Sequence, residues 1–155
     1  MAKGNTFVAQ GVIATITNDT YIERALPTGL TGNDNTAFRI KEFIFEHPIL
    51  GTGNGNRSEV HIARGTKVGI ALYSDTSLLV KDSRTMTLTT SGAVVQQPIV
   101  DVSPLGDIII VESQIFLGFK TTAFAGLASL GYKIIFEEIG IATDVRIAIL
   151  AQRLP

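Results

Sequence analysis

The chain contains no cysteine and no tryptophan, and only two of its 155 residues are histidine. The lack of cysteine excludes disulfide bonds, thiolate metal sites and cysteine nucleophiles. It does not indicate whether the protein works in an oxidising or a reducing compartment, because a cysteine-free protein tolerates both. The length predicts one domain, which buries roughly 68–70% of its unfolded surface without covalent staples.

Charged residues are also scarce. Asp, Glu, Lys and Arg make up 17% of the chain, against about 25% in ordinary soluble domains. The formal net charge is −1, which does not favour electrostatic capture of nucleic acid or of an anionic membrane. A low charge content is typical of subunits that bury surface against other subunits. The alternative is a surface of uncharged Thr, Asn, Ser and Gln.

Two kinds of apolar segment are missing. The start of the chain, Met1–Thr6, turns polar at once, and no signal-type apolar region follows it. No apolar run reaches the roughly 20 residues that cross a bilayer. We therefore expect a protein that is soluble when it is made.

What is present is a regular series of strand-like segments rich in Val, Ile, Thr, Phe and Tyr, separated by turn residues. Several alternate with period two, as at Val60 and Ile62 or at Ile115, Leu117 and Phe119. The predicted strands are 6–17, 20–26, 37–46, 58–64, 67–73, 77–80, 84–90, 94–101, 107–120 and 132–139. Since they do not alternate with helices, we expect an all-β antiparallel sandwich of jelly-roll type with eight to ten strands and at most one or two short helices.

Two of these strands carry further information. Within 37–46, Phe38 and Ile40 keep one phase and Phe43 and Phe45 take the other, which predicts a bulge near Glu42. The run 108–111 is apolar on both sides, which predicts a strand covered on both faces.

Helix signals are few. Residues 122–130 fit a short helix or an irregular crossing, although Gly126 weakens the helix. In the tail 143–153, Thr143 and Asp144 fit a helix cap, but Val145, Ile147 and Ile149 also alternate as a strand. The β-branched content favours the strand.

The glycine cluster 51–56 has the composition of a phosphate-binding loop but not the context. Such a loop lies between a strand and a helix, and here strand-like segments flank both sides. Gly51, Gly53 and Gly55 also miss the G-x-G-x-x-G spacing, because position 56 is asparagine. We interpret the cluster as a connection at one end of the sandwich.

The sequence offers only weak candidates for metal binding. His47 and His61, with Glu46 and Glu59 beside them, are the candidates for a metal site. The pattern instead favours His47 at a strand end before Pro48 and His61 facing solvent.

No carboxylate is placed by sequence to orient a serine–histidine pair. Glu137 and Glu138 are adjacent on a strand and should point to opposite faces, which does not suit an acid–base dyad. A basic run is missing too. We therefore expect no enzyme, no catalytic residue, no cofactor, no metal and no small-molecule substrate. The triplets that begin at Asn18 and Asn56 match a glycosylation motif only by chance.

The order of elements resembles the single jelly-roll coat proteins of small icosahedral viruses, in pattern and length over most of the chain. The resemblance is carried by a polar N-terminal arm, an Asn/Gly-rich first loop, the strand Phe38–Glu46 and the closing strand Gly131–Glu138. It implies a virion protein, soluble in the host cytoplasm before assembly. Its partners would be copies of itself and other virion proteins, joined in a shell by subunit contacts. A basic arm is lacking, which fits an interior lined by other proteins or by a membrane.

The resemblance also implies a division of the chain. Residues 1–17 form an arm or first strand, and 18–155 form the jelly-roll domain. We expect 2–17 and 152–155 to carry assembly, whereas the alternative is that these ends merely fray. Two other functions stay open. One is a β-sandwich module that binds a carbohydrate or a receptor, for which Tyr21 and Tyr73 are the loop aromatics. The other is a small barrel enzyme of the cupin kind, for which two histidines are too few.

Overall fold

The structure is a computed structural model. It describes residues 5–14, 20–30, 35–48, 55–72, 74–88, 94–101, 108–124 and 127–151, with 86–88 and 94–101 described by their backbone. The strands are β1 Thr6–Ala14, β2 Ile22–Pro27, β3 Thr36–Glu46, β4 Arg57–Ala63, β5 Leu78–Leu88, β6 Val94–Asp101, β7 Ile109–Ile110, β8 Gln114–Thr122 and β9 Ser129–Gly140. One helix, α1 Thr143–Ala151, follows β9. The predicted all-β class is confirmed.

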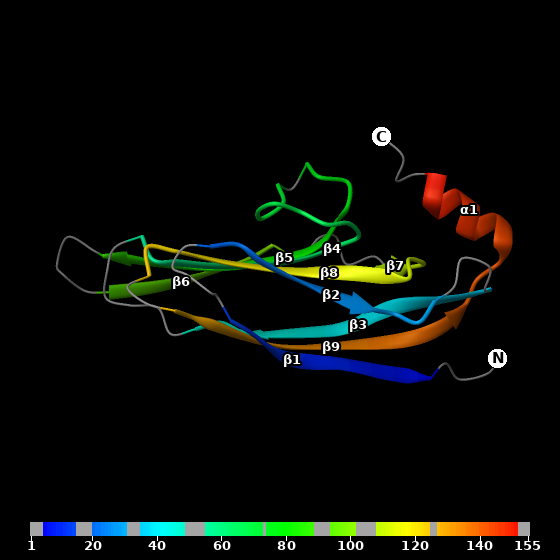
Figure 1. The fold of residues 1–155 in the computed structure, drawn as a ribbon, viewed down its shortest axis with the longest axis horizontal. Helices are drawn as coiled ribbons and strands as arrows, with labels where there is room; N and C mark the ends of the chain where they lie inside the picture. Colours follow the sequence, from blue (N-terminus) through cyan, green and yellow to red (C-terminus); the bar gives the residue numbers. More distant parts are fainter. Residues whose placement is uncertain are drawn as a thin grey trace.

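The strands form two sheets that pack face to face (Figure 1). Sheet A has the order β1-β9-β3-β7 and sheet B the order β2-β8-β4-β5-β6. Every pairing is antiparallel. The chain alternates between the sheets from β1 to β4 and again from β6 to β9, so neighbours within a sheet are far apart in sequence, except for the consecutive strands β4, β5 and β6. This winding is the jelly-roll arrangement that the sequence predicted.

The core lies between the two sheets and follows from period-two alternation. Val60 and Ile62 of β4 pair with Phe119 and Leu117 of β8, and all four side chains are fully buried. From sheet A, the buried side chains of Ile13, Phe38, Ile40, Leu130, Ile134 and Phe136 complete the same cluster. One face of each sheet is therefore apolar, and its burial holds the sandwich together.

The predicted bulge in β3 is confirmed. The register with β9 shifts between Ile40 and Glu42. Phe38 and Ile40 lie in the core, and after the shift Phe43 and Phe45 pack against the same cluster. The extra residue lets both halves of an out-of-phase strand face the core.

Two predicted strand boundaries are wrong in sheet B. Residues 67–72 form no strand, and the two segments predicted as 77–80 and 84–90 are joined in one strand, β5 Leu78–Leu88. The polar run Lys81–Ser83 suggested a turn. It is accommodated in mid-strand because its polar side chains have partners, as when Lys81 Nζ donates to the Ala71 carbonyl at 3.0 Å.

The predicted strand 107–120 is interrupted. Ile109 and Ile110 belong to sheet A, the chain bends at Glu112 and Ser113, and β8 then begins in sheet B. A continuous strand would place all of these apolar residues in one sheet. The break instead lets the segment contribute apolar residues to both sheets. The coverage predicted for 108–111 is confirmed in part, because Ile110 and Val111 are buried whereas Ile108 and Ile109 are half-buried.

The structure decides between the alternatives left open for these two segments: in the described residues of 122–130 the irregular crossing is confirmed, and in the tail the helix is confirmed and the favoured strand is wrong. For 122–130, Thr122 ends β8 and Ser129 begins β9, and the described residues between them are not helical. Ala123 adopts a left-handed φ of 59°, which no helix contains. The tail is a helix rather than a strand over Thr143–Ala151. An acidic Asp144 in its first turn complements the helix dipole, which outweighs the β-branched content.

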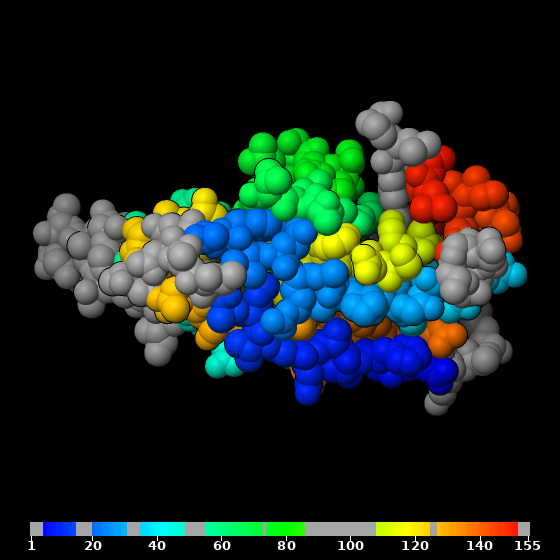
Figure 2. Space-filling model, viewed as in Figure 1, coloured from blue at the N-terminus to red at the C-terminus, as the bar shows by residue number. Residues whose placement is uncertain are grey.

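The two faces of the sandwich differ (Figure 2). The 64–77 loop, coloured green, and α1, coloured red, rise on the side of sheet B, whereas β1, in dark blue, lies on the opposite side with sheet A. We call the described residues of this segment, 64–72 and 74–77, the covering loop. In the described residues, no helix is long and apolar enough to span a membrane.

Candidate functional site

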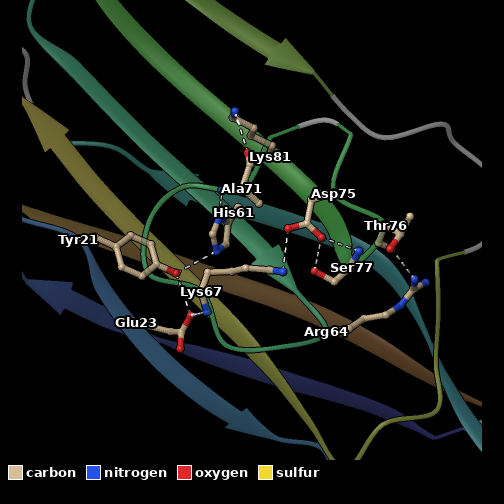
Figure 3. A network of polar contacts seen from close by, with 10 residues as sticks. All are labelled: Tyr21, Glu23, His61, Arg64, Lys67, Ala71, Asp75, Thr76, Ser77 and Lys81. Carbon is tan, nitrogen blue, oxygen red and sulfur yellow. Dashed lines mark hydrogen bonds and ion pairs between the residues drawn. The ribbon is translucent and has the colours of Figure 1, made fainter. Parts of the chain in front are cut away.

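The covering loop buries a histidine that was predicted to face solvent (Figure 3). His61 lies on the face of β4 opposite Val60 and Ile62, yet its side chain is fully buried. The prediction was wrong because it assumed that period two separates core from solvent, and here the loop covers the outer face of sheet B. This coverage was not predictable from the sequence, since the loop residues themselves alternate like a strand.

The hydrogen bonds around His61 run in one direction. The Ala71 N–H donates to His61 Nδ1 at 3.0 Å, which makes that nitrogen an acceptor. The neutral ring therefore carries its proton on Nε2 and donates to the Tyr21 hydroxyl oxygen at 3.1 Å. The Tyr21 hydroxyl in turn donates to Glu23 Oε2 at 2.8 Å. Each donor in this series donates one hydrogen bond, and the series ends at the carboxylate of Glu23.

Burial and charge fit this arrangement. Desolvation, followed by the neighbouring charges of Lys67 and Lys81, lowers the pKa of His61 to about 4, so the ring is neutral at physiological pH. Desolvation and the hydrogen bond to Glu23 raise the pKa of Tyr21 above its ordinary value. Neither group is poised to exchange a proton near neutral pH, which argues against a role in acid–base catalysis.

The same contacts fasten the covering loop to sheet B. The Lys67 N–H donates to Glu23 Oε2 at 2.8 Å, and Lys67 Nζ pairs with Asp75 at 2.7 Å. Hydrogen bonds from Lys67 and Ser77 lower the pKa of Asp75 to about 2. The network's polar atoms are thus used within the protein, and its role is to hold the loop.

The other histidine forms a second buried cluster. His47 Nδ1 lies 2.7 Å from Ser58 Oγ, and His47 Nε2 lies 3.0 Å from Asp82 Oδ2. The residue types are those of a hydrolase triad, but Ser58 is 0% exposed, so no substrate reaches its oxygen from solvent. The sequence offered no carboxylate for His47, because Asp82 lies 35 residues away and is brought close only by the pairing of β5 with β4.

The two histidines do not share a site. Ser58, the partner of His47, lies on the core face of β4, and His61 lies on the opposite face. Glu59 pairs with Arg57, and the Glu46 side chain lies beside Gly131 of β9. Within the described ranges, no group of three or more His, Asp or Glu side chains is placed to hold one metal ion.

The adjacent glutamates are also separated. Glu137 pairs with Arg39, whose Nε lies 3.1 Å from Glu137 Oε2. Glu138 accepts a hydrogen bond from the Asn5 side chain at 3.3 Å instead. They form no dyad.

Exposed apolar side chains mark a different kind of site. Helix α1 buries a charged residue, Arg146, whose Nη2 donates to the Val111 carbonyl at 3.0 Å. Val145, Ile147 and Leu150 are exposed on the same helix. This reverses the usual pattern of a surface helix, in which the apolar stripe faces the core.

An open hollow of about 560 Å³ lies between α1 and the base of the covering loop. Ile147, Leu150 and Ala151 line it from the helix, and Arg64 and Thr76 are among the residues that line it from the loop. The loop itself exposes Val68 and Leu72. We call Val68, Leu72, Ile147 and Leu150, which lie on the two elements that rise over sheet B, the loop–helix face.

A second hollow, of about 420 Å³, lies at the open side of the sandwich where β1 and β2 part. Apolar side chains line much of it, among them Phe7, Leu26, Leu30 and Phe136. At this edge, Val8 and Val12 of β1 are 51% and 58% exposed.

Other predicted residues are placed as follows. From the predicted arm 2–17, residues 6–14 form β1, which pairs with β9. Tyr21 belongs to the His61 network and is not a loop aromatic free to bind a ligand. The segment 152–155, Tyr73, Asn18 and the glycines at 51 and 53 lie outside the described residues. The strands β3 and β4 on either side of the glycine cluster agree with the sequence prediction, and Gly55 has a left-handed φ of 83°.

Comparison with known proteins adds no family to this description. No protein-family model matches the chain, and no curated protein sequence is similar to it.

Proposed function

We propose that the protein is a structural subunit that assembles with copies of itself into a closed shell, as a virion coat protein does. The jelly-roll fold, the low charge content and the exposed apolar side chains support this proposal. Its partners are other copies of the chain and other virion proteins, and its location is the virion after a soluble stage in the host cytoplasm. It needs no catalytic residue and no cofactor, because contact geometry is the function.

The observation that carries the proposal is the reversed polarity of α1. Docking the helix through Arg146 while exposing Ile147 and Leu150 leaves apolar area in water, which is unfavourable for an isolated subunit. A neighbouring subunit that covers the loop–helix face removes this area from water. Exposed apolar residues gathered in this way mark protein interaction sites.

The assembly state of the purified protein tests the proposal. Size-exclusion chromatography with light scattering and negative-stain microscopy should show capsomers or shells that form above a threshold concentration. The double variant Ile147→Asp and Leu150→Asp should shift the population from large particles toward small species, because it places charges in the contact.

The matched control is Ala148→Asp, since Ala148 is exposed on the same helix but does not line the hollow. It should assemble like the unchanged protein. A chain that stays monomeric at every concentration overturns the proposal.

A further inference from the structure

Among the residues that the structure describes, strand β1 is an edge strand without the usual protection against pairing. It lies at the end of sheet A and has β9 as its neighbour on one side. Its nine residues, TFVAQGVIA, include no charge and no proline. Its register with β9 runs from Thr6 to Ala14 without a bulge. Natural proteins normally blunt such an edge with lysine, proline or a bulge.

The hydrogen bonds at the two ends of β1 show which residues face the free edge. The Asn5 carbonyl accepts from the Glu138 N–H at 2.8 Å, so odd-numbered positions point their backbone groups toward β9. Because backbone direction alternates along a strand, the even-numbered positions Thr6, Val8 and Gln10 point theirs away from β9.

The Val12 carbonyl confirms this direction. It accepts from Arg24 Nη1, on β2, at 2.8 Å, so it faces away from β9 as the alternation requires. Arg24 therefore occupies the edge at Val12, whereas the stretch from Thr6 to Gln10 lies before that contact. The side chains of Val8 and Val12 also point outward, away from the core.

We propose that β1 is a two-fold contact between copies of this chain, in which β1 of one subunit pairs antiparallel with β1 of its partner, centred on Val8. This inference rests on the proposed function and names one of its interfaces. Centring on Val8 sets Thr6 opposite Gln10 of the partner subunit, and each of these residues points its N–H and C=O across the new boundary. The two four-stranded sheets then form one continuous sheet.

A second copy is the partner that fits this edge. An antiparallel pair about a two-fold axis sets a strand against itself, so the strand as a whole must be complementary to its own reverse, and only the central residue faces itself. Like charges directly opposite each other destabilise strand pairs, and the absence of charge in β1 removes that penalty. The contact also leaves the Arg24 bond to Val12 in place.

Cross-linking tests the pairing directly. The chain has no cysteine, so Val8→Cys introduces the only thiol. In the proposed pair the two Val8 Cα atoms lie about 5.5 Å apart, within the range of a disulfide. Under mild oxidation, Val8→Cys should form a covalent dimer at least about tenfold faster than Ile44→Cys. The control, Ile44, is equally exposed on the same sheet but lies on β3.

A second variant tests the hydrogen bonds. Val8→Pro removes an N–H that faces the free edge, which an edge strand tolerates without losing its bonds to β9. It should retain the circular-dichroism spectrum of the unchanged protein and lose the two-fold contact. Should this variant fail to fold, the cross-linking rate of Val8→Cys alone decides whether β1 pairs with β1 of a second copy.

The outcomes separate this inference from the proposed function. Large assemblies together with equal cross-linking rates for Val8→Cys and Ile44→Cys overturn the β1 pairing and leave the shell proposal standing. Dimers with fast cross-linking at position 8, but without larger particles, support the pairing and overturn the shell. A monomer with equal rates overturns both.

Discussion

At the scale of single residues, the two histidines lie against opposite faces of β4, and their hydrogen bonds define their roles. His47 joins Ser58 and Asp82 on the core side, and His61 joins Tyr21 and the covering loop on the other. Both act as connectors between segments distant in sequence. The side chains of both histidines are buried, which keeps them from a substrate in solvent.

We predict that acid loosens the covering loop through His61. Its pKa falls from 6.5 in the unfolded chain to about 4 in the fold. The neutral ring therefore contributes stability that is fully present above pH 6.5 and is lost as the pH falls toward 4, by about 3 kcal/mol. Urea unfolding at several pH values across this window measures the loss.

The control for this prediction is His61→Gln, which keeps a polar side chain without a group that titrates there. Its stability should fall less steeply between pH 6.5 and 4 than that of the unchanged protein. Equal slopes for the two proteins would show that other groups set the pH dependence.

Gly118 is predicted to be the least replaceable glycine of the described residues. A Cβ built there lies 2.4 Å from both His61 Nε2 and the Tyr21 hydroxyl, so Gly118→Ala must displace the centre of the network. We expect a loss of about 1–3 kcal/mol in the free energy of unfolding. Gly140→Ala, whose Cβ meets nothing within 4 Å, should change it by less than about 0.5 kcal/mol. Chemical denaturation of both variants makes the comparison, and equal losses would contradict it.

At the scale of elements, α1 and the covering loop are additions to the sandwich that are held by few contacts. The loop depends on the His61 network, and its base is closed where the Arg64 N–H donates to the Ser77 carbonyl at 2.9 Å. The helix depends on Arg146. Elements held in this way have low local stability and open before the core does.

Helix α1 is predicted to undock when its anchor is removed. Arg146→Ala leaves the Val111 carbonyl without the donor that reaches it from the helix. We expect a loss of about 1–3 kcal/mol, confined to the docking of α1. Amide hydrogen exchange should report faster exchange over Thr143–Ala151 while β4 and β8 stay protected. Asp144→Ala, an exposed change in the first helical turn, should cost only about 0.3–1 kcal/mol. Unchanged exchange in Arg146→Ala would mean that packing, rather than the anchor, holds the helix.

At the scale of the whole molecule, the apolar surfaces lie on two sides. The loop–helix face covers sheet B, and the β1 edge borders sheet A (Figure 1). Contacts on two sides of one subunit allow an assembly to grow beyond a dimer. The proposed β1 pairing is a two-fold contact, which alone closes at a dimer, so larger assemblies would need the loop–helix face as a second contact.

Because the loop–helix face is apolar, we predict that association through it responds to solvent as the hydrophobic effect does. It should strengthen in ammonium sulfate and weaken on cooling. Sodium chloride at about 0.5 M screens exposed charge pairs. It should leave the association intact, because the contact does not depend on such pairs. Light scattering against temperature and salt follows the response. Dissociation by sodium chloride would indicate that ion pairs hold the contact instead.

Much of the fold was predictable because it follows from local alternation. Val60 and Ile62, Leu117 and Phe119, and Ile134 and Phe136 face the core as their period-two pattern predicts. The bulge at Glu42 was predictable for the same reason, since a change of phase within one strand must be absorbed somewhere.

The errors occurred where the environment of a residue depends on a distant segment. Lys81 and Asp82 look like a turn until Ala71 and His47 are brought to them by the pairing of strands. Thr143–Ala151 is ambiguous between helix and strand in sequence, and its buried arginine has its partner 35 residues earlier in the chain.

By itself, the sequence determined the all-β class, the core faces of the main strands and the shortage of surface charge, because period, propensity and composition are local properties. Only the tertiary structure decided that β1 is a free edge, that His61 is buried and that α1 exposes its apolar side chains. Each of these depends on which segments cover which faces, and long-range packing, rather than local pattern, sets that coverage.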